Sequence, residues 1–256
     1  MLTKAAERDV DAARGPVSPS VVSGRAAMSG HLARLGAVAA AVGALVLFAS
    51  TMLHPSDADP GHAPAAFAEY ATDTLWVWSH LGQFAGIAAL GAALVALAGT
   101  LEPGRASNWG RVAVVGATAS VAGAAALQAV DGVALKSMVD RWAAAIGQEQ
   151  RIAFEAALAV RQIEIGLASL VSILFGLTWS LYGIAVLRSS RYPEWLGAVG
   201  LAGGLGTVTG GIVQASTGFS GLAMTISMTA SSLLLIWMIS IAVHMWRLAP
   251  RLETDG

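Results

Sequence analysis

Six long apolar stretches alternate with shorter polar segments along this chain of 256 residues. A helix rises about 1.5 Å per residue and the hydrocarbon core of a bilayer is about 30 Å thick, so about 20 apolar residues cross it. Each stretch meets that length. The apolar positions are also continuous, whereas the strands of a membrane barrel alternate. The pattern therefore predicts an all-α, polytopic membrane bundle with six transmembrane helices. They cover approximately residues 33–53, 74–99, 110–135, 162–187, 194–216 and 220–246.

The polar segments at the two ends predict tails around this transmembrane domain. Residues 1–30 are polar and rich in Gly, Ser and Pro, so we expect them to be disordered. The transmembrane domain then covers residues 31–249, and residues 250–256 form a second tail. Met28 stands just before the first span, so a translation start at Met1 or at Met28 fits the pattern.

Two connecting segments are long enough to hold structure of their own. In residues 54–73, the part from Pro64 to Tyr70 is expected to form a short helix over the bundle. In residues 136–160, apolar positions recur with helical spacing. This second segment predicts either extensions of the flanking helices or an amphipathic helix at the membrane interface.

The distribution of basic residues predicts the orientation. With six spans, 11 of the 15 basic residues fall on one side of the membrane, including all those of both tails. Basic residues concentrate in cytoplasmic segments, so both termini are expected to be cytoplasmic. Arg greatly outnumbers Lys, and Ala and Gly are abundant, which is typical of GC-rich bacterial genomes. We therefore expect a multi-pass protein of a bacterial inner (plasma) membrane.

Composition excludes several kinds of site. The chain is 55% hydrophobic and only 12% charged, as expected when lipid is the main solvent. It holds no cysteine, which excludes disulfides, thiolate metal sites, iron–sulfur clusters and a cysteine nucleophile. The net charge of −1 gives no reason to expect nucleic acid as a partner.

Small residues are expected to hold the helices together, because lipid provides no hydrophobic drive for their association. Residues 194–216 hold the pairs Gly200–Gly204 and Gly206–Gly210, and the second span holds Gly82–Gly86. Because glycines lie on most of its faces, the fifth span is expected to be surrounded by other helices. A homo-oligomer through these glycine faces is also compatible with the pattern.

Polar side chains inside the spans cluster at one predicted depth, the outer third of the bilayer. Ionisable groups at such depth are costly and commonly mark binding sites or proton relays. We therefore expect an outward-facing polar pocket, in which His80 bonds a carboxylate and Asp131 or Glu164 pairs with Arg161 or Lys136. The candidate ligand-binding residues are His80, Gln83, Gln128, Asp131, Arg161, Glu164 and Gln214.

Three functions remain open for this cluster. The residues favour a non-enzymatic membrane protein whose polar cluster binds a small molecule or lipid, or holds the bundle together. A small-solute transporter or channel is the first alternative, although no charged path crosses the inner half. A membrane-embedded enzyme that uses His80 with Asp131 or Glu164 as acid and base is the second.

More specific sites draw little support from the spacing, so we expect no catalytic residue, cofactor or metal. A metal site would need His54, His62 and His80 with Asp57 or Asp59, and their spacing is irregular. Haem would need a facing histidine pair, which only His80 and His54 could supply.

The segment Gly218-Phe219-Ser220-Gly221 resembles the GxSG nucleophile motif of rhomboid intramembrane proteases. The resemblance covers four residues. The histidine that follows, His244, is predicted at the opposite membrane face, so a loop of Gly and Ser accounts for the motif without chemistry.

The layout as a whole resembles the six-span bacterial membrane proteins grouped as DUF4386, over roughly residues 30–250. The features that carry the resemblance are Arg34-Leu35-Gly36 at the first span, His54-Pro55 at its exit, the acidic segment that follows, and Trp78-Ser79-His80 at the second span. The resemblance implies a six-helix membrane domain and no particular activity.

Overall fold

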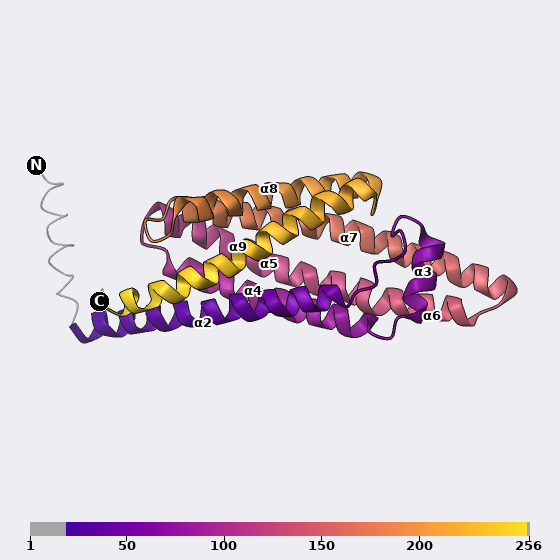
Figure 1. The fold of residues 1–256 in the computed structure, drawn as a ribbon, viewed down its shortest axis with the longest axis horizontal. Coiled ribbons are helices and arrows are strands. Elements are labelled where there is room, and N and C mark those ends of the chain that lie inside the picture. The colour runs from indigo at the N-terminus through magenta and orange to yellow at the C-terminus, as the bar shows by residue number, and fades with distance from the viewer. Residues whose placement is uncertain (1–18, 255–256) are drawn as a thin grey trace, which may run out of the picture.

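The predicted spans are helices that lie side by side in one elongated bundle (Figure 1). A computed structural model describes the backbone of residues 19–254 and the side chains from residue 29 onward. Six of its helical segments are long and apolar enough to cross a membrane, and the described residues hold no strand. In chain order the elements are α2 (Pro19–Met52), α3 (Ala63–Thr72), α4 (Trp76–Thr100), α5 (Arg105–Gln128), the π-helix η1 (Ala129–Leu135), α6 (Lys136–Ala144), α7 (Gly147–Leu187), α8 (Glu194–Thr217) and α9 (Gly221–Thr254).

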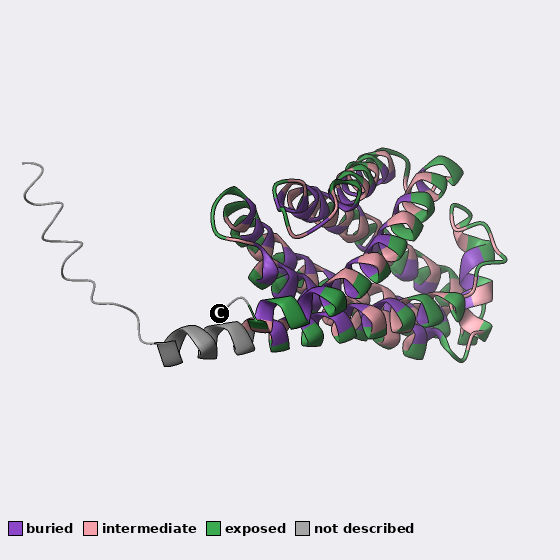
Figure 2. Ribbon diagram, turned by 60° about the vertical axis from the view of Figure 1, so that its left-hand side comes forward, coloured by how far each residue is buried: buried purple, intermediate pink, exposed green. Residues whose placement is uncertain are grey.

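The spans form a closed ring in sequence order. Each span packs on the next, and α9 returns to pack on α2. Helix α9 crosses the bundle obliquely, lying along α2 near the C-terminus and along α8 at its other end (Figure 1). Buried residues follow the inward faces of the helices, while exposed residues cover the outside (Figure 2). We call the two ends of the bundle the α3 end and the terminal end, the latter carrying the C-terminus.

Glycine allows the closest helix contacts. A Cβ on Gly183 of α7 would lie 2.5 Å from the backbone nitrogen of Leu201 in α8, and a Cβ on Gly176 would lie 2.5 Å from that of Val208. Such approach is the expected role of small residues between membrane helices. The glycines of α8 face α7 and α9, but Leu205 on another face is exposed. The expectation that this span is surrounded by helices is therefore wrong, and an oligomer through its glycines stays a prediction.

Helical structure extends into both of the expected tails. Helix α2 already begins at Pro19, because proline suits the first turn of a helix and no further proline follows before residue 30. The rest of the expected N-terminal tail, residues 1–18, lies outside the described part. At the other end α9 continues through Pro250 to Thr254, because buried Leu252 and the Arg34–Glu253 ion pair hold its last turn against the rest of the bundle.

The two connecting segments pack on each other at the α3 end. The short helix expected from Pro64 to Tyr70 is confirmed as α3. Residues 136–160 form α6 and the first turns of α7, so the extension alternative is the correct one. Gly147, with φ of +59°, lies at the reversal between α6 and α7, a backbone region that suits glycine. Phe67 of α3 packs edge-on to Phe154 of α7, so α3 is anchored on the hairpin.

Candidate functional site

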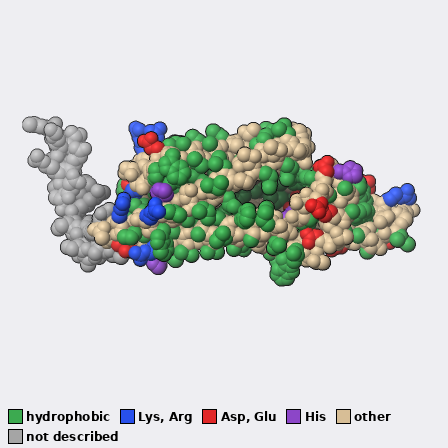
Figure 3. All heavy atoms as spheres, in the orientation of Figure 1, with side chains coloured by type: hydrophobic (Ala, Val, Ile, Leu, Met, Phe, Trp, Pro, Cys, Tyr) green, Lys and Arg blue, Asp and Glu red, His purple; other side chains and the backbone are tan. Residues whose placement is uncertain are grey.

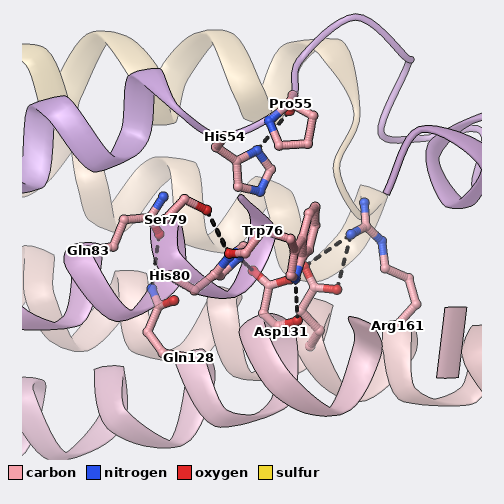
Figure 4. A network of polar contacts seen from close by, with 10 residues as sticks. His54, Pro55, Trp76, Ser79, His80, Gln83, Gln128, Asp131 and Arg161 are labelled. Carbon is pink, nitrogen blue, oxygen red and sulfur yellow. Dashed lines mark hydrogen bonds and ion pairs between the residues drawn. The ribbon is translucent and has the colours of Figure 1, made fainter. Parts of the chain in front are cut away.

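A histidine–carboxylate pair lies between α4 and η1 at the α3 end (Figure 4). His80 Nε2 is 3.1 Å from Asp131 Oδ2, and His80 Nδ1 is 2.7 Å from the carbonyl oxygen of Trp76. His80 Nε2 forms no hydrogen bond of good geometry with any described residue, but the 3.1 Å separation is within ion-pair range for a protonated ring. The expected pairing of His80 with a carboxylate is therefore present in the geometry.

The π-helix positions Asp131 for this pair. A π-turn widens the helix and frees backbone groups from their usual α-helical hydrogen bonds, which explains why such turns recur at functional sites. Here the carbonyl oxygen of Asp131 accepts a hydrogen bond from Trp76 Nε1 at 3.1 Å. Gly132 lets the helix approach closely, since a Cβ there would lie 2.5 Å from the Cβ of His80.

Aromatic rings surround the pair, forming an aromatic cluster of His54, Tyr70, Trp76 and His80. The Trp76 ring lies 4.2 Å from Tyr70, 4.6 Å from His80 and 4.8 Å from His54, between centroids. Trp76 is 1% exposed. The nearby Trp78, by contrast, is exposed. Tyr70 and Trp76 were missed as members of the site because aromatic side chains are not costly in lipid. His54 was considered only as a metal or haem partner of His80, and the two ring centroids lie 5.1 Å apart.

Arg161 links four segments at the same end. Its guanidinium donates to both carboxylate oxygens of Glu164, at 3.2 and 3.1 Å, and to the carbonyl oxygen of Pro60 at 3.1 Å. It also lies over the rings of Phe219, at 4.6 Å, and Tyr70, at 5.5 Å. Both charged side chains of the pair are almost fully buried. Arg161 thus joins α7 to α3, to the segment before α3, and to the α8–α9 connection.

The remaining polar residues considered for the site differ in their hydrogen-bond partners. Gln128 donates to Gln83 at 3.2 Å across α5 and α4. Gln214 is buried, but its Nε2 has no partner among the described residues, and no hydrogen bond joins its side chain to the cluster. The expected pairing of a carboxylate with Arg161 or Lys136 is present between Glu164 and Arg161, whereas Lys136 pairs with Asp140 and with backbone oxygens of α3.

Burial shifts the pKa values of two groups outside the membrane spans. The pKa of His54 lies below its ordinary value, first because burial disfavours the charged ring and second because His80 lies close by. The Nδ1–H of His54, which donates to the Pro55 carbonyl, opposes this shift only in part. Burial raises the pKa of Tyr70. Both groups are therefore neutral when the aromatic cluster is assembled near neutral pH.

The shift of His54 predicts a pH dependence of stability. Below the ordinary histidine pKa of about 6.5, the unfolded chain binds a proton at this position more readily than the folded chain, so the free energy of unfolding falls as pH decreases towards the folded-state pKa. His54→Gln is expected to remove this contribution. Unfolding in detergent micelles between pH 8 and pH 5 measures it, with exposed His62→Gln as the control. An unchanged pH profile in His54→Gln would contradict the prediction.

The polar cluster is covered by α3 and the segment before it, and a large cavity lies apart from it. A cavity of about 350 Å³ lies deeper in the bundle and is lined by residues of all six spans. None of the seven candidate residues lines it. The cavity is therefore distinct from the outward-facing pocket expected at the polar cluster.

The cavity has a mouth between α2 and α9. Phe48 and Met52 of α2 and Met228 of α9 line the cavity and are also half exposed on the outside. The two helices pack tightly only towards the terminal end, where Gly36 of α2 meets Met245 of α9. Figure 3 shows the surface hollowed between them.

Other chemistry suggested by the sequence has a structural explanation. Ser220 accepts a hydrogen bond from the backbone N–H of Ala223 and contacts Thr217 Oγ1, which satisfies the start of α9. His244 bonds the Ser240 carbonyl in the half of α9 that leads to the terminal end. Among the described residues, no group of three or more His, Asp and Glu side chains is arranged to hold a metal ion.

No curated protein and no solved structure matches the chain. A family match does exist, to the family described as "Domain of unknown function (DUF4386)", and it covers residues 28–242. That range begins just before the apolar part of α2 and reaches into the last turns of α9, so it takes in the whole ring of helices, the polar cluster and the cavity. This six-span membrane protein therefore belongs to the DUF4386 family.

Proposed function

We propose that this protein binds a single lipid chain or a similarly apolar small molecule inside the membrane, in the cavity enclosed by its six spans. The observation that carries the proposal is the cavity itself, with its volume of about 350 Å³ and its mouth between α2 and α9. Ligand pockets begin at about 300 Å³, and a cavity of about 150 Å³ already accepts benzene. A mouth that faces lipid admits molecules dissolved in the bilayer.

The walls favour an apolar occupant over an ion or a charged solute. No charged side chain is among the described residues that line the cavity. Ion pathways need polar or charged groups along the whole path, because these replace the hydration of the ion. The cavity therefore gives the channel alternative little support.

The aromatic cluster and the polar cluster serve as a lid over this cavity. His80 and Asp131 pair beneath α3 and do not line the cavity, so an acid–base role on a bound molecule draws no support from their position. Their role in this proposal is to fix α3 and the end of α2. With both termini cytoplasmic in a bacterial inner membrane, the mouth faces the outer leaflet.

Quenching of Trp179 tests the proposal. This residue lines the cavity and is 6% exposed, so lipid outside the bundle does not reach it. In nanodiscs of phosphatidylcholine with brominated chains, we expect quenching that depends on Trp179, obtained as the difference between the wild type and Trp179→Phe. Filling the cavity with Ser172→Phe or Ser232→Phe should abolish that component.

Leu170→Phe is the matched control, because Leu170 lies on the exposed face of the same helix as Ser172. It is expected to leave the quenching of Trp179 unchanged. The proposal fails if brominated lipid does not quench Trp179 in the folded wild type, or if the cavity-filling variants fold normally and are quenched as before.

A further inference from the structure

Seven hydroxyl side chains line the cavity, and three of them make no hydrogen bond to any described residue. Thr51, Thr178 and Thr207 donate to carbonyl oxygens of their own helices, as hydroxyls in membrane helices commonly do. Ser120 shares a hydrogen bond with the hydroxyl of Thr178. Ser172, Ser231 and Ser232 have no such bond, although all three line the cavity. A hydroxyl without a partner in an apolar environment is costly, so these three are available to donate to a ligand.

The free serines contrast with other hydroxyls of the same helix. In α9, Thr225, Thr229 and Ser240 each donate to the carbonyl four residues before, at 2.8 to 2.9 Å, and none of them lines the cavity. The free donors of α9 are thus Ser231 and Ser232, which the helix turns towards the hollow, together with Ser227, whose hydroxyl is buried without a partner against α8. A cavity built only for an acyl chain has no need of free donors.

Two aromatic side chains add a flat wall. Phe175 and Trp179 are one turn apart in α7 and both line the cavity. Trp179 meets Trp237 edge-to-face, with centroids 5.3 Å apart and an interplanar angle of 80°, which fixes the orientation of its indole. Aromatic faces held in this way favour stacking against a planar group.

We infer that the cavity binds the ring of a quinone-like molecule, an inference that rests on the proposed function. Such a molecule has a planar, apolar ring that carries carbonyl oxygens, and an isoprenoid tail. The serine hydroxyls donate to the carbonyl oxygens, and Phe175 and Trp179 stack on the ring. The tail leaves through the mouth between α2 and α9 into the lipid. Ligands with a charged head are excluded, because the walls supply no countercharge.

Binding of short-tailed menaquinone-1 to the full chain in nanodiscs tests this inference. Quinones quench tryptophan, so saturable quenching that is lost in Trp179→Phe reports occupancy of the cavity. The triple variant Ser172→Ala, Ser231→Ala and Ser232→Ala removes the free donors with little change of volume. We expect it to weaken menaquinone-1 binding by about tenfold, equivalent to about 1.4 kcal/mol, because the donors to the quinone carbonyl oxygens are lost.

The triple variant Thr225→Ala, Thr229→Ala and Ser240→Ala is the control. It is expected to leave menaquinone-1 binding unchanged, because these hydroxyls already bond their own helix.

Brominated phosphatidylcholine separates the two proposals. If it quenches Trp179 but menaquinone-1 does not, the quinone inference fails and chain binding stands. If neither reaches Trp179, both fail. Equal affinity of the triple serine variant and the wild type for menaquinone-1 also overturns the inference.

Discussion

Arg161→Met is expected to lower the free energy of unfolding by about 3–5 kcal/mol, the usual cost of removing one partner from a buried ion pair. The side chains of Arg161 and Glu164 are only 5% and 3% exposed, so the change leaves a buried carboxylate without a counterion. It also removes the donor to the Pro60 carbonyl and the cation over Phe219. Far-UV circular dichroism during unfolding in mixed micelles measures the loss.

Two further variants make this prediction specific. Arg34→Met breaks the exposed pair with Glu253 and is expected to cost at most about 1 kcal/mol. Arg161→Met combined with Glu164→Leu removes both charges, and we expect it to recover most of the stability, because an apolar replacement of a buried pair is often neutral. A loss below about 1 kcal/mol in Arg161→Met alone would show that the pair does not hold this end of the bundle together.

Gly183→Leu is expected to destabilise the fold by about 3 kcal/mol, the upper end of the usual cost of overpacking. A Cβ at this position would lie 2.5 Å from the backbone nitrogen of Leu201 and 2.9 Å from the carbonyl oxygen of Gly197. Backbone atoms cannot move aside as a flexible side chain can, so α7 and α8 must separate. Thermal unfolding in detergent, followed by size-exclusion chromatography, measures the effect.

Gly166→Leu is the control on the same helix. Nothing lies within 4 Å of a Cβ on Gly166, so the substitution meets open space. Leucine also has a higher helix propensity than glycine, by up to about 1 kcal/mol, so unchanged or slightly higher stability is expected. Equal losses in the two variants would indicate a general intolerance of α7 to larger residues instead of a close contact with α8.

The membrane fold could be predicted because it follows from local composition. Hydropathy placed all six spans, and the turn at Pro193 before α8 agrees with the rule that proline starts or ends a helix. The π-helix could not be predicted, because it depends on the approach of Gly132 to His80, which are far apart in the sequence. The helical continuation to Thr254 likewise depends on contacts with α2.

The candidate site could be predicted only in part. Polar side chains are costly in lipid, and this argument identified His80, Asp131, Arg161 and Glu164. The structure pairs His80 with Asp131 and Arg161 with Glu164. Depth along a helix does not reveal which way a side chain faces, so Gln214 was grouped with residues to which no hydrogen bond joins it. The cavity lay beyond prediction altogether, because its lining consists of ordinary apolar and hydroxyl residues contributed by six separate helices.

Because α9 packs against both α2 and α8, the bundle is incomplete until the last helix leaves the ribosome. Roughly 170 residues separate Met52 from Gly221, and synthesis at about 5–20 residues per second takes on the order of 10–30 s to cover them. During that interval the face of α2 that contacts α9 lacks this partner, so the insertion machinery or surrounding lipid must shield it. A ligand can be enclosed only after α9 has been synthesised and has packed on α2 and α8, so no earlier intermediate can hold one.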